Sequence, residues 1–319
     1  MSGQQQRHVT ERLPDTLAGR DRAAVLLTQG RLVAFPTETV YGLGADATNA
    51  DAVRAIYAAK NRPSFNPLIV HVADMKMAKR FGKFDEMAED LAARFWPGGL
   101  TLVVPLQDDA GLPREVTAGL SSVALRMPAN ESARALIRAV GLPLAAPSAN
   151  PSGRVSATTA DHVLSGLDGR IAAVLDGGPT TLGLESTIVA VTPDGPRLLR
   201  AGSVTSEALG FGATPASVIE NKAPTSPGQL ASHYAPKGTV RLNATDALPG
   251  EVMIGFGDTP GDVTLSATGD LDEAAASLFA VLHDMDARGA DRIAVAPIPE
   301  TGIGRAINDR LRRAAAPRN

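Results

Sequence analysis

Residues 60 to 71 read Lys60-Asn61-Arg62-Pro63-Ser64-Phe65-Asn66-Pro67-Leu68-Ile69-Val70-His71. Two cations close an amphipathic helix, a loop punctuated by prolines follows, and an apolar strand then ends on a histidine. Lys60 and Arg62 supply fixed positive charge, and Ser64 and Asn66 add neutral donors, so that the loop suits an anion. An ordinary helix C-terminus, where cations offset the negative end of the helix dipole, explains the same residues.

The composition of the whole chain limits the kinds of protein to which this stretch can belong. The 319 residues are 44% hydrophobic, which is enough for one large or two ordinary domains with real cores. The formal charge of -3 argues against a globally basic nucleic-acid binder, although a local basic groove is compatible with it. Cysteine is absent, which excludes disulfides, thiolate nucleophiles and cysteine metal sites.

The N-terminal residues are polar, and no later run approaches the ~20 apolar residues of a membrane span. We therefore expect no signal peptide, no membrane contact and a cytoplasmic protein.

Helices and strands mix without strict alternation on both sides of residues 60–71. Hydrophobic periodicity and cap residues predict helices over 17–29, 49–60, 74–81, 85–95, 131–140 and 158–167. Apolar runs predict strands over 31–35, 67–72, 100–106, 123–128, 142–146, 171–175, 188–191 and 197–200, and a polar, glycine-rich loop over 37–44. This pattern favours an α/β fold with a mixed sheet that includes antiparallel pairs.

Arg126 is conspicuous because it lies inside an apolar strand segment. An exposed edge position with a snorkelling stem is one explanation for it, and a ligand-binding cation is the other.

Residues 210–237 turn to Gly, Ala, Thr, Pro and Ser without helical or strand period, which predicts a linker. Its end, Ser232-His233-Tyr234-Ala235-Pro236, has distinctive side chains, although a proline-rich tether with an incidental aromatic explains it too. Residues 238–319 then predict strands over 240–243, 252–256 and 292–297 and helices over 271–288 and 304–315. A smaller α/β domain fits them, so the expected division is 1–209, a linker or lid over 210–237, and 238–319.

Several kinds of catalytic machinery are missing from the sequence. None of the five histidines has the spacing of a metal site, and neither a Gly-x-Ser-x-Gly elbow nor a P-loop occurs. Hydroxyls and cations instead gather at predicted strand or helix ends, where open sheets place ligand sites. Together they indicate a phosphate-and-carboxylate site, which suits phosphoryl or nucleotidyl transfer because that chemistry needs mainly positioning and charge neutralisation.

Four motifs occur in order along the chain. They are Pro36-Thr37-Glu38-Thr39-Val40-Tyr41-Gly42-Leu43-Gly44, Ala59-Lys60-Asn61-Arg62-Pro63 with Asn66-Pro67-Leu68-Ile69-Val70-His71, Ala146-Pro147-Ser148-Ala149-Asn150, and Glu185-Ser186-Thr187. Together these motifs resemble those of the YrdC-type L-threonylcarbamoyladenylate synthases. Pro227-Gly228 and His233-Tyr234-Ala235-Pro236 resemble the linker of the longer, two-domain form. The C-terminal region resembles that form more loosely, through Gly302-Ile303-Gly304 and Asn308-Asp309-Arg310-Leu311.

The resemblance implies a twisted, open mixed sheet with helices, followed by a smaller Rossmann-like α/β domain. It implies condensation of L-threonine, bicarbonate and ATP to threonylcarbamoyl-AMP and pyrophosphate, for threonylcarbamoyl-adenosine modification of tRNA. Mg²⁺ would be held mainly by the nucleotide phosphates, with no protein metal site. Transient contact with tRNA or with downstream threonylcarbamoyl-transferase proteins is compatible with this role.

The matched motif positions imply a division of the site. The threonine end would be met by Thr37, His71, Arg126, the backbone at Ala146, and Ser186. The ATP end would be met by Lys60, Ser64, Asn66, Ser122, Ser148, Asn150, Ser156, Arg200 and, from the linker, Tyr234. Lys60 and Arg62 would be the catalytic cations, which oppose the triphosphate and stabilise the departing pyrophosphate.

The chain departs from the family pattern at Gly99 and Ala201, where prolines are usual, and at residues 229–232, where a more basic run is typical. The first two changes spare the polar groups, whereas the third weakens the case for a phosphate contact from the linker. Two rival interpretations stay open on the sequence alone. One is a module that binds tRNA or double-stranded RNA, and the other is a relative that transfers carbamoyl to another acceptor.

Overall fold

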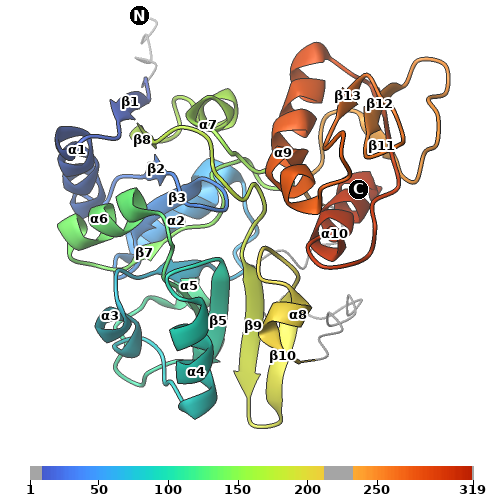
Figure 1. Ribbon diagram of the computed structural model, residues 1–319. Coiled ribbons are helices and arrows are strands. Elements are labelled where there is room, and N and C mark those ends of the chain that lie inside the picture. Colours follow the sequence, from blue (N-terminus) through green and yellow to red (C-terminus); the bar gives the residue numbers. More distant parts are fainter. Residues whose placement is uncertain (1–8, 212–232, 318–319) are drawn as a thin grey trace, which may run out of the picture.

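A computed structural model describes residues 9–211 and 233–317, which form two sheets with flanking helices (Figure 1). The larger sheet has ten strands in the order β1-β8-β2-β3-β7-β4-β6-β5-β9-β10. These strands are β1 (Glu11–Pro14), β2 (Val33–Phe35), β3 (Gly42–Asp46), β4 (Ile69–His71), β5 (Leu100–Pro105), β6 (Ser122–Arg126), β7 (Leu144–Ala145), β8 (Ala173–Asp176), β9 (Thr187–Thr192) and β10 (Gly195–Arg200).

The same part of the chain contains eight described helices. They are α1 (Leu17–Thr28), α2 (Ala50–Lys60), α3 (Met75–Lys79), α4 (Glu86–Phe95), α5 (Arg114–Thr117), α6 (Glu131–Val140), α7 (Ala160–Leu167) and α8 (Ser206–Leu209). Strand β4 pairs in parallel with β6, whereas β5 pairs antiparallel with β6 and parallel with β9. The mixed sheet predicted from the sequence is therefore confirmed.

Strand pairing brings three distant segments to one row across this sheet. His71, the last residue of β4, lies opposite Arg126, the last residue of β6. Strand β5 then places Leu100 opposite Thr187, the first residue of β9. Because β10 runs antiparallel to β9, its last residue, Arg200, returns to the same end of the sheet.

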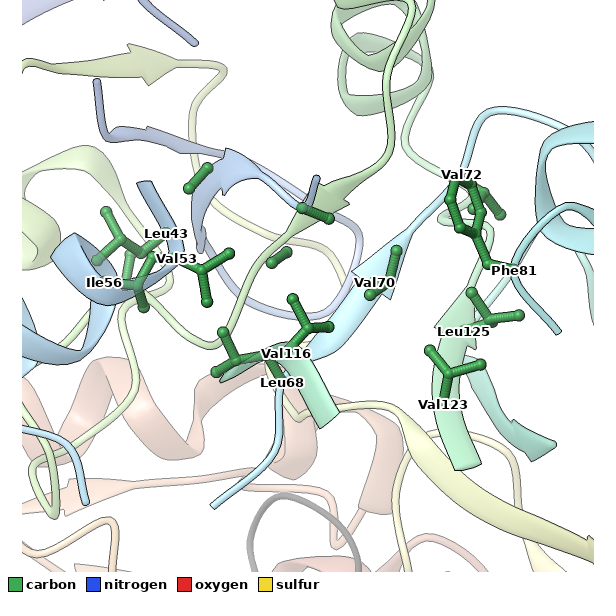
Figure 2. Packing of buried hydrophobic residues seen from close by; sticks show 14 of the residues in the cluster. Leu43, Val53, Ile56, Leu68, Val70, Val72, Phe81, Val116, Val123 and Leu125 are labelled. Atoms are coloured by element: carbon green, nitrogen blue, oxygen red, sulfur yellow. The ribbon is translucent and has the colours of Figure 1, made fainter. Parts of the chain in front are cut away.

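A large apolar core packs helix α2 against the sheet (Figure 2). Val53 and Ile56 lie three residues apart on one face of α2 and are fully buried with Leu43 of β3. Leu68 and Val70 bracket the start of β4 in the same core. Lys60 is thus delivered by a helix whose buried face fixes its direction.

Cap residues set the helix ends as the sequence predicts. The side chain of Asn49 accepts hydrogen bonds from the backbone of Asp51 and Ala52 at the start of α2. Asn61 ends that helix in the left-handed region with φ of 51°, a position that asparagine tolerates. Helix α6 spans the predicted residues and ends at Gly141, with φ of 73°.

Two expectations for this part are corrected. Residues 42–44 belong to β3 and not to a loop, because the strand is paired on both sides, with β2 and β7. Arg126 does not lie at an exposed edge: β6 has β4 and β5 as neighbours, and only 3% of the residue is exposed. Elements β1, α5 and α8 were not predicted, because each is only four residues long and carries little periodicity.

The C-terminal part folds on a four-stranded parallel sheet of order β11-β14-β12-β13. Its elements are β11 (Thr239–Arg241), β12 (Val252–Gly255), β13 (Val263–Thr264), α9 (Leu271–Arg288), β14 (Arg292–Val295) and α10 (Gly304–Ala315). Both helices have the predicted bounds, and the short β13 was not predicted. Ala274, Leu278 and Leu282 of α9 are buried as the periodicity indicates.

The two parts of the chain share a core. Val40, Val155 and Leu184 of the first part pack in one apolar cluster with α9, β12 and β14. The rings of His162 and His283 also stack across the junction, with centroids 3.8 Å apart. Most of the predicted linker, residues 212–232, lies outside the described residues. None of the helices within the described ranges has the length and apolar character to span a membrane.

Candidate functional site

A buried cavity lies where the ends of β2, β4, β6 and β10 meet the start of β9. Its volume is about 50 Å³. Three arginines, two histidines, and several hydroxyls give it a polar, cationic lining. The lining residues are Thr37, Thr39, Val40, Gly42, Arg62, Ile69, His71, Arg126, Ala146, Pro147, Ser148, Glu185, Ser186, Arg200, His233 and Tyr234.

All five residues expected at a threonine end line this cavity: Thr37, His71, Arg126, Ala146 and Ser186. The Oγ1 atom of Thr37 closes a turn, since it donates to the carbonyl of Val40 at 2.6 Å and accepts from the amide of Thr39 at 3.2 Å. The turn therefore fixes the position of this hydroxyl at the end of β2.

Arg126 is held by a buried ion pair with Glu38. Its Nη2 lies 2.6 Å from Glu38 Oε1, its Nη1 donates to Thr39 at 2.9 Å, and its Nε donates to the carbonyl of Gly98 at 3.2 Å. Burial would raise the pKa of Glu38, but the guanidinium of Arg126 lowers it below its ordinary value. Glu38 therefore keeps Arg126 in one orientation at the cavity wall.

Ser186 and Arg200 form a second fixed unit. Arg200 donates from Nε and Nη2 to the carbonyl of Ser186, at 3.0 and 2.9 Å, and Nη2 also reaches Ser186 Oγ at 3.1 Å. Thr101 of β5 lies 2.7 Å from the same hydroxyl. Gly202 permits this arrangement, because a Cβ there would lie 2.4 Å from the Glu185 carbonyl and the Thr187 amide.

Lys60 lies directly behind the loop of Ser148 and Asn150. Its Nζ donates to both backbone carbonyls, at 2.6 Å for Ser148. Burial, with a smaller contribution from Arg62, lowers the pKa of Lys60 well below its ordinary value. The amine is therefore one contact away from the cavity that Ser148 lines.

Arg62 lines the cavity, and two backbone carbonyls hold its guanidinium. Its Nε and Nη2 donate to the carbonyls of Asn66 and Pro67, at 3.3 and 3.0 Å. Burial lowers the pKa of Arg62 to about 10, so the guanidinium stays charged at neutral pH. Asn66 itself is buried and contacts Arg62 through this carbonyl, while its side-chain amide has no hydrogen-bond partner among the described residues.

The other residues expected at an ATP end divide into three groups. Ser156 donates its hydroxyl to the lining residue Glu185 and so lies just behind the lining. Asn150 donates its side-chain amide to Pro151 and Arg154, and with them it lines a separate cavity. Ser64, on an exposed turn, and Ser122, at the opposite end of β6 from Arg126, are not brought to the cavity.

Two histidine nitrogens at the cavity lack hydrogen-bond partners among the described residues. They are Nδ1 of His71 and Nδ1 of His233, and both are buried. Burial, together with nearby cations, lowers the pKa of His71 to about 3 and that of His233 well below its ordinary value. Both rings are therefore neutral at physiological pH, and a buried polar atom without a partner is what a ligand would satisfy.

The burial of neutral His71 makes the fold acid-sensitive. Its pKa is lower in the folded protein than the ordinary 6.5, so the full contribution is present above that value and is lost as pH falls. Between about pH 8 and about pH 5 this single group should reduce the free energy of unfolding by about 2 kcal/mol.

Chemical denaturation at both pH values checks this expectation. His71→Gln should lose about 2 kcal/mol less than the unsubstituted protein over that interval, because the variant has no ring to protonate in the unfolded chain. Equal losses in both proteins would show that His71 is not held neutral by the fold.

Sequence reasoning missed the partners of several site residues. Glu38 and Thr39 lie inside a quoted motif, but nothing in that motif says that they hold Arg126. Glu185 also lies inside a motif and received no role, and Arg310 of α10 pairs with it from the C-terminal part. The hydroxyls at residues 37 and 39 were the one local feature of the sequence that pointed to these partners.

Within residues 9–211 and 233–317, no group of three or more acidic, histidine or cysteine side chains could hold a metal ion. The carboxylates of Glu38 and Glu185, which contact this site, are each paired with an arginine.

Two family models match the chain in succession. Residues 25–202 match the model Sua5_yciO_yrdC, described as telomere recombination. Residues 203–316 match the model described as threonylcarbamoyl-AMP synthase, C-terminal domain.

Relatives match over nearly the whole length. The chain is 44% identical to the threonylcarbamoyl-AMP synthase of Bacillus subtilis, over 93% of each chain. It is 40% identical to the enzyme of that name from Pyrococcus abyssi, over 92% of this chain and 93% of the other. The crystal structure of P. abyssi Sua5 complexed with L-threonine superposes with a TM-score of 0.87 and 37% identity, over 96% of this chain and 97% of the other.

Proposed function

Since the chain belongs to the two-domain Sua5/YrdC family of threonylcarbamoyl-AMP synthases, we propose that it condenses L-threonine, bicarbonate and ATP to threonylcarbamoyl-AMP and pyrophosphate. It is accordingly a nucleotidyltransferase, and its product serves the threonylcarbamoyl-adenosine modification of tRNA. The observation that carries this proposal is the buried cavity lined by Arg62, Arg126 and Arg200 together with hydroxyls and neutral histidines. Such a lining suits anionic substrates that react through oxygen.

The threonine end lies at Thr37, His71, Arg126, Ala146 and Ser186. Arg126 supplies the charge for the threonine carboxylate, since Glu38 orients its guanidinium but leaves it at the cavity wall. The hydroxyls of Thr37 and Ser186 and the unpartnered Nδ1 of His71 supply polar contacts. The L-threonine complex of P. abyssi Sua5 supports a threonine site on this fold.

The nucleotide end is formed by Arg62, Ser148 and Arg200, which line the cavity. Lys60, Asn150 and Ser156 support that wall from behind. Ser64 and Ser122 are the outermost proposed contacts, since Ser64 lies on an exposed turn and Ser122 lies roughly 13 Å from Arg126 along β6. Asn66 is a proposed contact that is buried and bonded to Arg62 through its carbonyl. A ligand as long as ATP extends beyond the lining.

In the proposed reaction, an oxygen of the threonine carbamate forms a bond to the α-phosphorus, and the bond from that phosphorus to the bridging oxygen of pyrophosphate breaks. Arg62 and Lys60 offset the charge that develops on the departing pyrophosphate, so they are the proposed catalytic cations. The donors fit Mg²⁺ held by the phosphates of ATP, because Glu38 and Glu185 are already ion-paired. When bound, Mg²⁺ would neutralise phosphate charge.

Tyr234 forms part of the cavity wall. The residue is 1% exposed and lines the cavity with His233. A volume of about 50 Å³ is far below the roughly 300–1,000 Å³ of ligand pockets, so this part of the linker must move to admit ATP. Closed, it would exclude water from the reactive mixed anhydride. The proposed domains are residues 1–209 and 238–319, joined by a linker or lid over residues 210–237.

Pyrophosphate release tests the proposed reaction. With ATP, Mg²⁺, L-threonine and bicarbonate present, release should be steady, and it should fall to background when threonine or bicarbonate is omitted. Threonine-independent release would contradict the proposal. RNA binding that needs no threonine and weakens steeply with salt would instead favour a binding module, and release that depends on another carbamoyl acceptor would favour a carbamoyl-transferring relative.

Three further expectations belong to this proposal. The enzyme works in the cytoplasm, Mg²⁺ accompanies ATP, and the product passes to tRNA or to downstream threonylcarbamoyl-transferase proteins by transient contact. Magnesium removal by a chelator should therefore stop pyrophosphate release, and added Mg²⁺ should restore it.

A further inference from the structure

Helix α10 of the C-terminal part places a buried arginine against the wall of the cavity. Nε of Arg310 lies 2.9 Å from Oε2 of Glu185, and the two side chains are 0% and 7% exposed. Nη1 donates to the carbonyl of Ala201 at 2.8 Å and to Asp309 at 2.9 Å. The ion pair therefore connects the two parts of the chain at a point shielded from solvent.

Glu185 connects Arg310 to the cavity. It lines the cavity itself, and its other oxygen, Oε1, accepts the hydroxyl hydrogen of Ser156. The next residue, Ser186, is the one that Arg200 holds. Through Ser156, which is proposed for the nucleotide end, one carboxylate thus links Arg310 to that end, while Ser186 next to it belongs to the proposed threonine end.

Arg310 also packs under Tyr234. Its guanidinium carbon lies 5.2 Å from the centroid of the tyrosine ring, which stacks on Phe279 of α9 at 5.6 Å. Tyr234 has φ of 61°, in the left-handed region that non-glycine residues rarely adopt. Such a conformation persists only when the surroundings enforce it, and Arg310 and Phe279 are two of those surroundings.

From these contacts we propose that Arg310 is a positioning residue for the nucleotide half of the site, so that the C-terminal domain sets the affinity for ATP. The inference rests on the proposed function and adds to it a residue outside the catalytic domain. Arg310 acts by neutralising Glu185 and by supporting the ring of Tyr234, without touching the reacting atoms.

The effect expected from loss of Arg310 follows from the charge of Glu185. Without Arg310, the carboxylate of Glu185 stays buried at a wall that faces the triphosphate, and like charges repel strongly where water is excluded. The threonine end has its own ion pair, Arg126 with Glu38, and its residues make no hydrogen bond with Arg310 in the described structure, although Ser186 follows Glu185 in the chain. Loss of Arg310 should therefore weaken ATP binding selectively.

The test compares Arg310→Met, Arg310→Lys and Arg305→Met in the full chain. Arg305 is the matched control, because it lies on the same helix and also pairs across the junction, with Glu207, but these side chains are 39% and 55% exposed. Pyrophosphate release gives the KM for ATP and for threonine. Calorimetric titration with a non-hydrolysable ATP analogue measures nucleotide binding without turnover, and melting temperatures record stability.

Arg310→Met should raise the KM for ATP roughly tenfold to hundredfold and leave the KM for threonine within about threefold. Arg310→Lys should fall between Arg310→Met and the unsubstituted protein, because it keeps the charge but loses the planar fork. Arg305→Met should match the unsubstituted protein. An unchanged KM for ATP, or equal increases for both substrates, would overturn the proposal.

A second comparison covers variants that fail to fold. If Arg310→Met does not fold, the KM for ATP of Arg310→Lys is compared with that of Arg305→Met. Equal KM values for ATP in these two variants would overturn the proposal. Adding Glu185→Gln to Arg310→Met removes both charges, which often restores stability, and should recover part of the ATP affinity. Failure of the proposed function can be distinguished from failure of the Arg310 proposal. In the first case the unsubstituted protein would release no pyrophosphate, and the titrations with the ATP analogue would still test Arg310.

Discussion

Arg126→Ala is expected to lose at least about hundredfold in threonine affinity. The substitution removes the cation proposed for the threonine carboxylate and leaves Glu38 buried without its partner. Breaking a buried ion pair in this way should also lower the free energy of unfolding by about 3–5 kcal/mol. Threonine titration and chemical denaturation measure the two losses.

A double variant separates these two effects. Arg126→Ala with Glu38→Gln removes the stranded charge, so stability should recover substantially while threonine binding stays lost. The matched control is Arg138→Ala, which breaks an exposed pair with Glu131 and should cost no more than about 1 kcal/mol. If the double variant regained threonine affinity, Arg126 would have a structural role only.

Lys60→Ala is expected to reduce turnover at least about hundredfold and to leave the threonine dissociation constant within about threefold. Nζ of Lys60 holds the carbonyls of Ser148 and Asn150, the loop that forms the nucleotide wall. Its loss leaves both carbonyls without this donor and removes a positive charge near the departing pyrophosphate. Single-turnover pyrophosphate release and threonine titration check the two parts.

Lys83→Ala is the control for this substitution, since Lys83 is exposed and pairs with Asp108. It should leave both quantities unchanged. Equal losses of turnover and threonine binding in both Lys60→Ala and Arg126→Ala would contradict the proposed division of the site into a nucleotide end and a threonine end.

The helices were predictable because their signals are local. Helix α6 begins after Asn130, whose side chain caps the amide of Ala133, and ends at Gly141. Helix α9 follows the same logic, since Asp270 caps the amide of Glu273 and Gly289 ends the helix. Helix α10 has no side-chain cap and was predicted from its periodicity alone. By contrast, β1 is an edge strand of four residues, polar and apolar, that pairs with β8. Glu11 lies opposite Ala173, which is 162 residues later in the chain, and no local sequence pattern predicts that pairing.

The same contrast applies to the site. The sequence places polar groups at strand ends, and the cavity brings Thr37, Arg126 and Ser186 together as expected. It cannot show which partners hold them, because Glu38 is 88 residues from Arg126. Lys60 illustrates the limit: its motif indicates an anion contact, whereas the fold first turns the amine toward two backbone carbonyls.

The pairing of Glu185 with Arg310 has a consequence for the order of synthesis. The ribosome makes Glu185 125 residues before Arg310. At roughly 5–20 residues per second, this interval lasts about 6 to 25 seconds. During that time a catalytic domain that has already folded carries a carboxylate whose counter-ion does not yet exist. The proposed nucleotide wall can therefore reach its final form only as α10 docks, so chains that lack α10 should be poor at engaging ATP.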